Sequence, residues 1–251
     1  MKIDAILSPV ELPVLVLRDL RDTVCVVFDV LRATSTIVTA LHNGAKAVIP
    51  LAEISEALAL RQKQPGVLLG GERDGVKIRA SQTSSVDFDL GNSPREYTPE
   101  KVRGKTIVST TTNGTRALRA CARAQTVLAA SFLNLTATAQ FVRQLQPARI
   151  LLVCAGTREN MADEDVLAAG ALGEMLLRNS GRRTVSDSVE TARNAWRKAK
   201  SNLLEVVSGS ENARRLLAIA ELRDDVAFCL QQDVYNLAAV LGRDGAIQIS
   251  I

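Results

Sequence analysis

Short apolar segments alternate with segments of helical pattern through most of this chain, and this alternation limits its fold more than any other feature. Continuous apolar runs typical of buried strands occupy residues 24–28, 105–109, 126–129 and 149–154. Helical patterns follow them at residues 35–43, 114–122, 135–145 and 163–177. Such alternation predicts an α/β fold, because each helix returns the chain to begin another parallel strand.

The strand segments are apolar throughout instead of alternating with polar residues, which is typical of a sheet buried on both faces. We therefore expect a three-layer α/β/α fold with a largely parallel or mixed sheet. Residues 47–49 and 66–69 are further strand candidates, with a helix at 53–62 between them. We expect the last apolar run, 246–251, to add an edge strand.

The length of 251 residues fits one large α/β domain. We predict a single domain over residues 1–251, with two subdomains as the alternative. These would be an α/β core at about 1–180 and a mostly helical C-terminal part at 181–251. Residues 70–104 interrupt the alternation, so we expect either a functional segment or a linker between subdomains.

Composition argues against several classes of protein. Aromatic residues make up only 3% of the chain and the net charge is +4, which disfavours nucleic-acid binding. We expect no membrane association, because no apolar run reaches the roughly 18 residues of a membrane span. We expect a cytoplasmic protein, because the N-terminus lacks a signal-peptide pattern and the cysteines form no paired motif. A homodimer is a possible assembly, since two-fold dimers are common.

Polar residues gather where the predicted strands end, and ligands bind beyond the carboxyl ends of strands in parallel α/β sheets. We name the segments that follow five strands the first to fifth loops, at residues 29–36, 70–73, 110–116, 130–134 and 155–158. Four of these loops carry an arginine: Arg32, Arg73, Arg116 and Arg158. Arginine binds phosphate-type oxygens through paired hydrogen bonds. The loops therefore predict a site for a small, multiply anionic ligand.

Hydroxyl groups and amides near helix N-termini would complete such an anion site. The candidate substrate-binding residues of this kind are Thr34, Ser35, Thr36, Thr111, Thr112, Asn113, Gly114, Thr115, Ser131, Gly156 and Thr157. Capping of the following helix is the alternative for each hydroxyl taken singly. The prediction depends on the same chemistry recurring at successive strand ends.

Acidic residues accompany the arginines. Asp29 ends the first strand, Glu72 follows two glycines, and Glu164 and Asp165 lie at the start of the helix at 163–177. Carboxylates of this kind favour Mg²⁺, which takes one or two of them together with phosphate oxygens and water. Two alternatives stay open: acids at a helix start stabilise the helix dipole, and Asp29 could pair with Arg32.

The loops together resemble the 2-phosphosulfolactate phosphatase family. The matching segments are FDVLRATSTIVTAL (28–41), GGER (70–73), FDLGNSPREYTP (88–99), TTTNGTRAL (110–118), AASFLN (129–134), CAGTR (154–158) and EDVLAAGA (164–171). The resemblance implies a cytoplasmic, Mg²⁺-dependent phosphatase with an α/β/α fold. It implies hydrolysis of 2-phospho-3-sulfolactate to 3-sulfolactate and phosphate, a step of coenzyme M biosynthesis. It adds Asn92 and Ser93 to the candidate substrate-binding residues.

The expected roles follow from this chemistry. We expect Asp29, with Glu72 or with Glu164 and Asp165, to hold Mg²⁺, and Arg32 and Arg116 to stabilise the transferring phosphoryl group. Arg158 or Arg73 would hold the carboxylate or sulfonate of the substrate. Residues 79–87 and 159–163 depart from the usual family pattern, which bears on substrate choice. The rival hypotheses are a non-catalytic anion-binding protein and a phosphotransferase.

Overall fold

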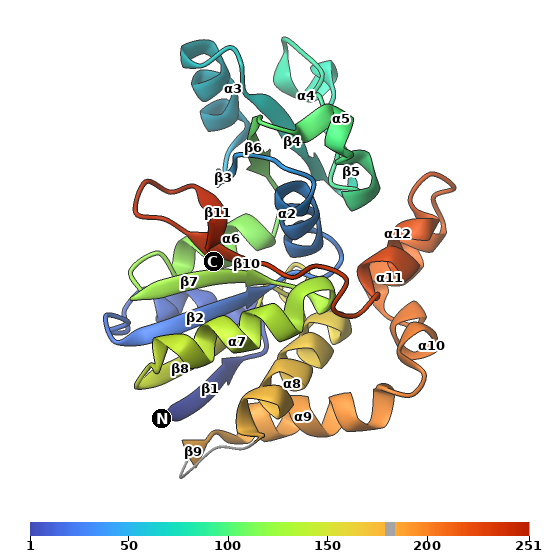
Figure 1. The fold of residues 1–251 in the computed structure, drawn as a ribbon. Coiled ribbons are helices and arrows are strands. Elements are labelled where there is room, and N and C mark those ends of the chain that lie inside the picture. The colour runs from blue at the N-terminus through green and yellow to red at the C-terminus, as the bar shows by residue number, and fades with distance from the viewer. Residues whose placement is uncertain (179–183, 251) are drawn as a thin grey trace.

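The computed structural model describes residues 1–178 and 184–250, in which eleven strands form one mixed sheet flanked by helices (Figure 1). Their order across the sheet is β5-β4-β6-β3-β11-β10-β7-β2-β8-β1-β9. The predicted α/β class is confirmed. The strands are β1 (Lys2–Ile6), β2 (Thr23–Phe28), β3 (Ala47–Pro50), β4 (Leu68–Arg73), β5 (Val76–Lys77), β6 (Thr106–Thr110), β7 (Thr126–Ala130), β8 (Arg149–Cys154), β9 (Thr184–Val185), β10 (Ala238–Leu241) and β11 (Ile247–Ser250).

Helices cover both faces of the sheet around β2. The α-helices are α1 (Leu12–Leu15), α2 (Ala33–His42), α3 (Ile54–Lys63), α4 (Ala80–Thr83), α5 (Pro99–Val102), α6 (Gly114–Ala120), α7 (Leu135–Leu145), α8 (Asp163–Leu177), α9 (Asp187–Ala199), α10 (Leu203–Ser208), α11 (Glu211–Leu217) and α12 (Arg223–Cys229). Short 3-10 helices are η1 (Pro9–Glu11), η2 (Pro94–Glu96) and η3 (Phe132–Asn134).

Strand β2 shows why the apolar runs are continuous. Val24, Val26 and Phe28 belong to the core formed with α7, α8 and α9, whereas Cys25 and Val27 belong to the core formed with α1, α2 and α6. Successive side chains of a strand point to opposite faces, so a strand between two helical layers needs apolar residues at every position. This part of the molecule has the predicted α/β/α layering.

The sheet contains two groups of parallel strands that run in opposite directions. One group is β4-β6-β3 and the other is β7-β2-β8-β1, with β10 and β11 between them. Strand β10 is antiparallel to β7 and to β11, and β11 is antiparallel to β3. In Figure 1 the first group forms the upper part of the molecule and the second the lower part. A flat sheet would place their carboxyl ends at opposite edges.

The twist of the sheet brings the carboxyl ends of the two groups together. Neighbouring strands are rotated by roughly 20–25°, so the five steps from β6 to β2 add up to on the order of 100°. The junction is also narrow, since β11 and β3 pair through Ile247 and Val48 alone in the described residues. The first group is thereby turned relative to the second, and loops from both groups meet at one cleft.

The expectation that residues 246–251 form an edge strand is wrong. Strand β11 lies inside the sheet, between β3 and β10; residue 251 itself lies outside the described residues. The apolar run at β10, which sequence patterning did not indicate, forms a hairpin with β11 through a turn in which Gly245 has φ of +80°. The hairpin supplies the antiparallel strands that join the two parallel groups. Strand β1 was likewise not predicted, and it pairs with β8.

Residues 70–104 form an ordered part of the fold. They contain the end of β4, then β5, α4, η2 and α5, and the side chains of Phe88 and Tyr97 are buried. The Leu90 amide donates to Leu69 O (3.0 Å), which holds this segment along β4. The proposed subdomain boundary near residue 180 lies outside the described residues. Beyond it, helices α9 to α12 precede the return to the sheet at β10, so the C-terminal part is not purely helical.

Among the described residues, no helix is both long and apolar enough to span a membrane.

Candidate active site

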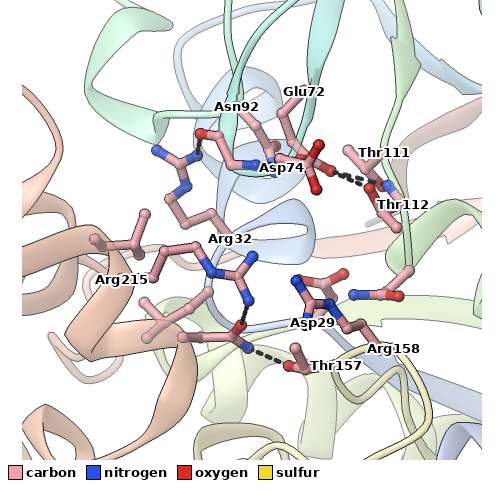
Figure 2. Close-up of a pocket in the computed structure, with 15 residues that line it drawn as sticks. Asp29, Arg32, Glu72, Asp74, Asn92, Thr111, Thr112, Thr157, Arg158 and Arg215 are labelled. Carbon is pink, nitrogen blue, oxygen red and sulfur yellow. Dashed lines mark hydrogen bonds between the residues drawn. The ribbon is translucent and has the colours of Figure 1, made fainter. Parts of the chain in front are cut away.

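A polar cleft lies where the two groups of strands meet (Figure 2). Four of the five predicted loops reach it, joined by residues of the 70–104 segment and of α11. The residues that line it are Asp29, Leu31, Arg32, Glu72, Asp74, Gly75, Asn92, Thr111, Thr112, Asn113, Thr157, Arg158, Asn212, Arg215 and Leu216. Acidic and basic side chains therefore share one polar space.

Asp29 is placed by the turn between β2 and α2. Its Oδ1 accepts a hydrogen bond from the Ala33 amide (3.1 Å), and its own amide donates to Thr34 Oγ1 (3.0 Å). Only 8% of the residue is exposed. Burial raises the pKa of Asp29 to about 7, and the charges of Glu72 and Glu164 add to this, whereas the Ala33 and Gly114 amides act in the opposite direction. A buried carboxylate in a negative potential is a favourable place for a cation.

The hydroxyls of the first loop form bonds within the protein instead of lining the cleft. Thr34 accepts from the Asp29 amide, Ser35 Oγ donates to Val30 O (2.8 Å), and Thr36 Oγ1 donates to Asn92 O (2.8 Å). All three residues are buried. They shape the loop and join it to the 70–104 segment, and none of them caps α2, which has no side-chain capping bond at its N-terminus.

Arg32 is held by a partner that no strand-end motif indicates. Its Nη1 lies 2.7 Å from Asp225 Oδ2, and the two side chains are 2% and 0% exposed. Its Nη2 donates to Gly75 O (2.5 Å), and Asp225 Oδ1 accepts from Ser93 Oγ (2.7 Å). Arg32 therefore lines the cleft with its charge balanced from behind by α12. Ser93 supports this ion pair and does not line the cleft, whereas Asn92 does.

Glu72 joins the second and third loops. Its Oε1 accepts from the amide and hydroxyl of Thr112 (2.9 and 3.0 Å), and its Oε2 accepts from the Gly75 amide (2.7 Å). Gly70 to Arg73 belong to β4 itself instead of following a strand. Alternation of side chains along β4 sends Arg73 away from the cleft, where it donates to Ala52 O (3.1 Å) and Thr110 Oγ1 (3.0 Å).

The third loop lines the cleft with Thr111, Thr112 and Asn113. Thr115 supports Thr111, their hydroxyls lying 3.1 Å apart. Gly114 begins α6 so close to the first loop that a Cβ there would lie 2.6 Å from Ala33 Cβ and 2.7 Å from Asp29 Oδ2. The position thus requires glycine.

The structure does not bring Arg116 to the cleft. It is exposed on α6 and is not among the lining residues, so its predicted role in catalysis gains no geometric support. The fourth loop is also absent from the lining. Ser131 is fully buried, and its Oγ accepts from the Leu133 amide (3.3 Å) as the N-cap of η3.

The fifth loop contributes Thr157 and Arg158. Asp165 holds this loop against the first one, because its Oδ2 accepts from the Gly156 amide (3.0 Å) and its Oδ1 from the Val30 amide (2.8 Å). Burial, with the charges of Asp29 and Glu164, raises the pKa of Asp165 well above its usual range. Asp165 thus acts as a buried bridge between loops and does not line the cleft.

Glu164 is fully buried behind the cleft. Its Oε1 accepts from Asn212 Nδ2 (2.7 Å), while its Oε2 has no hydrogen-bond partner in the described residues. Burial raises its pKa. A buried carboxylate oxygen without a donor is unusual, and it adds to the negative potential at Asp29.

Comparison with known proteins fits this geometry. The family model described as 2-phosphosulpholactate phosphatase matches residues 12–243. The chain belongs to the 2-phosphosulpholactate phosphatase family. This confirms the resemblance of the loops, and with it the class of enzyme expected, a phosphoric monoester hydrolase.

Three relatives show how much of the chain is shared. A protein of Thermotoga petrophila is 43% identical over 216 residues, covering 86% of this chain and 88% of its own length. One of Caldanaerobacter subterraneus subsp. tengcongensis is 40% identical over 236 residues, with 93% of both chains covered. One of Synechococcus sp. is 38% identical over 244 residues, with 96% of both covered. Each is named a probable 2-phosphosulfolactate phosphatase.

The acids of this family member can be compared with what Mg²⁺ requires. No cluster of three or more His, Cys, Asp or Glu side chains suited to a metal exists in residues 1–178 and 184–250. Mg²⁺ does not need one, because it retains water and takes phosphate oxygens beside one or two carboxylates. Asp29 and Glu72 provide hard oxygen donors on the cleft wall, so the residues present fit this ion.

Several residues of the cleft do not follow a predicted strand, so the search of strand ends did not identify them. Asp74 lies in the turn after β4, and Asn212, Arg215 and Leu216 come from α11. The only local signal for α11 is the spacing of Asn212 and Arg215, three positions apart on one helix face, between buried apolar residues. That pattern is equally typical of an ordinary surface helix.

Proposed function

We propose that the protein is a Mg²⁺-dependent phosphatase that converts 2-phospho-3-sulfolactate to 3-sulfolactate and inorganic phosphate in the cytoplasm, as a step of coenzyme M biosynthesis. Family membership and the names of the relatives support the reaction. The observation that carries the proposal is the shared lining of the cleft, where the carboxylates of Asp29 and Glu72 face the same space as Arg158 and Arg215.

This distribution of charge suits a phosphate ester with further anionic groups. Asp29 and Glu72 would hold Mg²⁺, which when bound neutralises phosphate charge and polarises the P–O bond. Asn113 lines the same cleft and would donate to phosphoryl oxygens as charge develops. Glu72 accepts hydrogen bonds from the Thr112 and Gly75 amides, and these bonds fix the loops of the cleft before substrate binds. Such preorganisation is the main protein contribution to phosphoryl transfer.

Water is the expected acceptor of the phosphoryl group. The bond between phosphorus and the ester oxygen breaks, a water oxygen bonds to phosphorus, and the released alkoxide of 3-sulfolactate takes up a proton. Attack by Asp29 itself, with a covalent intermediate, ranks lower. The Asp29 carboxylate already accepts from the Ala33 amide and is packed against Gly114, which restricts its approach to phosphorus.

The test is phosphate release from 2-phospho-3-sulfolactate with Mg²⁺ and with EDTA, in the wild type, Asp29→Asn and the surface variant Asp19→Asn. We expect release that needs Mg²⁺, a loss of about 100-fold or more in Asp29→Asn, and no loss in Asp19→Asn. Calorimetry of Mg²⁺ binding gives an independent readout of the Asp29 variant. Ligand binding without turnover would favour the anion-binding hypothesis, and turnover only with an acceptor other than water would favour the phosphotransferase.

A further inference from the structure

Three guanidinium groups of the described residues line the cleft, and they differ in how their charge is balanced. Arg32 forms a buried ion pair with Asp225 at 2.7 Å. The Arg158 guanidinium has no hydrogen bond or ion pair within residues 1–178 and 184–250. Arg215 lies 3.6 Å from Glu211 in a pair that is 34% and 49% exposed, and such pairs contribute little in water. Arg158 and Arg215 are therefore the cations available to a ligand.

The placement of Arg215 is built into the fold. Three positions earlier on the same face of α11, Asn212 Nδ2 donates to Thr157 Oγ1 (2.5 Å) and to Glu164 Oε1 (2.7 Å). These bonds fix α11 against the fifth loop and the start of α8. Asn212 Oδ1 also accepts a long bond from Arg215 Nη2 (3.5 Å), which orients the guanidinium without neutralising it.

The two available arginines approach the cleft from opposite sides. In Figure 2, Arg158 and Arg215 point toward one another across the cavity, Glu72 and Asp74 lie together at its upper side, and Asp29 is drawn beside Arg158. The carboxylates of Asp29 and Glu72 suit a cation and the phosphate that it binds. The space between the two guanidinium groups suits a second oxyanion, because arginine binds sulfonate and carboxylate oxygens through paired hydrogen bonds.

We propose that Arg215, facing Arg158, binds the non-phosphate anionic group of the substrate and thereby determines which phosphate esters are hydrolysed. This inference rests on the proposed function and adds a specificity-determining residue from the C-terminal helices. The group bound is the sulfonate or the carboxylate of 2-phospho-3-sulfolactate. For esters that lack the bound group, Arg215 does not contribute to kcat/KM.

The kinetic test compares the wild type, Arg215→Ala and Arg214→Ala on three esters. Arg214 is the matched control, because it is exposed on the same helix, does not line the cleft, and donates to Gly209 O. The esters are 2-phospho-3-sulfolactate, 2-phospholactate, which lacks the sulfonate, and the phosphate ester of 2-hydroxyethanesulfonate, which lacks the carboxylate.

We expect Arg215→Ala to lower kcat/KM for 2-phospho-3-sulfolactate by roughly 10- to 100-fold, mainly through KM. For the ester that lacks the group bound by Arg215, the variant and the wild type should agree within about twofold. Arg214→Ala should match the wild type on all three. An equal loss on all three esters, or no loss on any, overturns the proposal.

A binding measurement separates this proposal from the phosphatase activity. Calorimetry with 3-sulfolactate and with lactate, on the same proteins, needs no turnover. Binding of 3-sulfolactate that weakens about tenfold or more in Arg215→Ala, but not in Arg214→Ala, supports the role of Arg215 even if no ester is hydrolysed. Unchanged binding in Arg215→Ala overturns it even if the wild type is an active phosphatase.

Discussion

Arg32 and Asp225 form a buried ion pair at 2.7 Å that joins the first loop to helix α12, almost two hundred residues later in the chain. Ser93 Oγ donates to the other carboxylate oxygen of Asp225, at 2.7 Å. One carboxylate thus connects three segments around the cleft. The pair balances the charge of Arg32, so this arginine holds the cleft wall while leaving Arg158 and Arg215 to interact with anions.

Replacing Asp225 by Asn should destabilise the protein by about 3–5 kcal/mol, because it leaves the Arg32 guanidinium buried without a counter-charge. Chemical denaturation measures this change. Asp224→Asn is the matched control: Asp224 is 70% exposed in its pair with Arg95, so its loss should cost less than about 1 kcal/mol. Equal effects of the two substitutions would contradict the assignment of Arg32 to a structural pair.

The raised pKa of Asp29, about 7, makes stability depend on pH in the absence of metal. A raised pKa means that the folded state favours the protonated carboxyl. This contribution is fully present below the ordinary value of 3.8 and is lost as the pH rises through about 7. In EDTA, the Tm of the wild type should therefore fall relative to that of Asp29→Asn between pH 5 and pH 8, by at least about 2–4 °C.

The control for this measurement is Asp19→Asn. Asp19 is exposed, and its hydrogen bonds with Arg21 lower its pKa, so it stays ionised over the whole range. The difference in Tm between the wild type and Asp19→Asn should therefore not change with pH. A gap for Asp29→Asn that is the same at pH 5 and pH 8 would show that Asp29 does not titrate there. Mg²⁺ added at pH 8 should raise the Tm of the wild type but not that of Asp29→Asn.

Gly114→Ala should impair both stability and activity. The new Cβ would lie 2.6 Å from Ala33 Cβ and 2.7 Å from Asp29 Oδ2, so the first loop must shift. We expect about 1–3 kcal/mol of destabilisation from overpacking and on the order of 100-fold lower kcat from the displaced carboxylate. Gly66→Ala, where a Cβ meets no atom within 4 Å, should leave both unchanged. Wild-type kcat in Gly114→Ala would argue against a catalytic position for Asp29.

Arg116 and Arg158 can be distinguished by substitution. Arg116 is exposed on α6, whereas Arg158 lines the cleft. We expect Arg158→Ala to lower kcat/KM for 2-phospho-3-sulfolactate roughly 10- to 100-fold and Arg116→Ala to stay within about twofold of the wild type. A large loss in Arg116→Ala would support the catalytic role that was predicted for this arginine from the third loop. It would also mean that Arg116 reaches the cleft in a conformation other than the one described.

Local sequence was sufficient for most of the central helices and strands, though not for β1 and β10, and for several residues of the site. Helices α7 and α8 and strand β8 have the predicted bounds, because period and length decide such elements within a few residues. Asp29, Thr111, Thr112 and Arg158 were found by looking beyond strands, since polar residues directly after a buried strand are exposed to whatever the sheet edge binds. Glu72 was found in the same way, although it lies within β4.

Only the tertiary structure decided which of these side chains face the cleft. Strand direction depends on pairing between distant segments. Local sequence therefore does not predict the central place of β11 or the opposite directions of the two parallel groups. The same holds for Asp225, which pairs with Arg32 behind the cleft, and for Arg215, which lines it; both come from helices that follow no strand end. Sequence by itself determined that anion-binding chemistry is present; long-range packing determined that Arg32 is paired and that Arg158 and Arg215 are available, because a charge is neutralised by its neighbours in space.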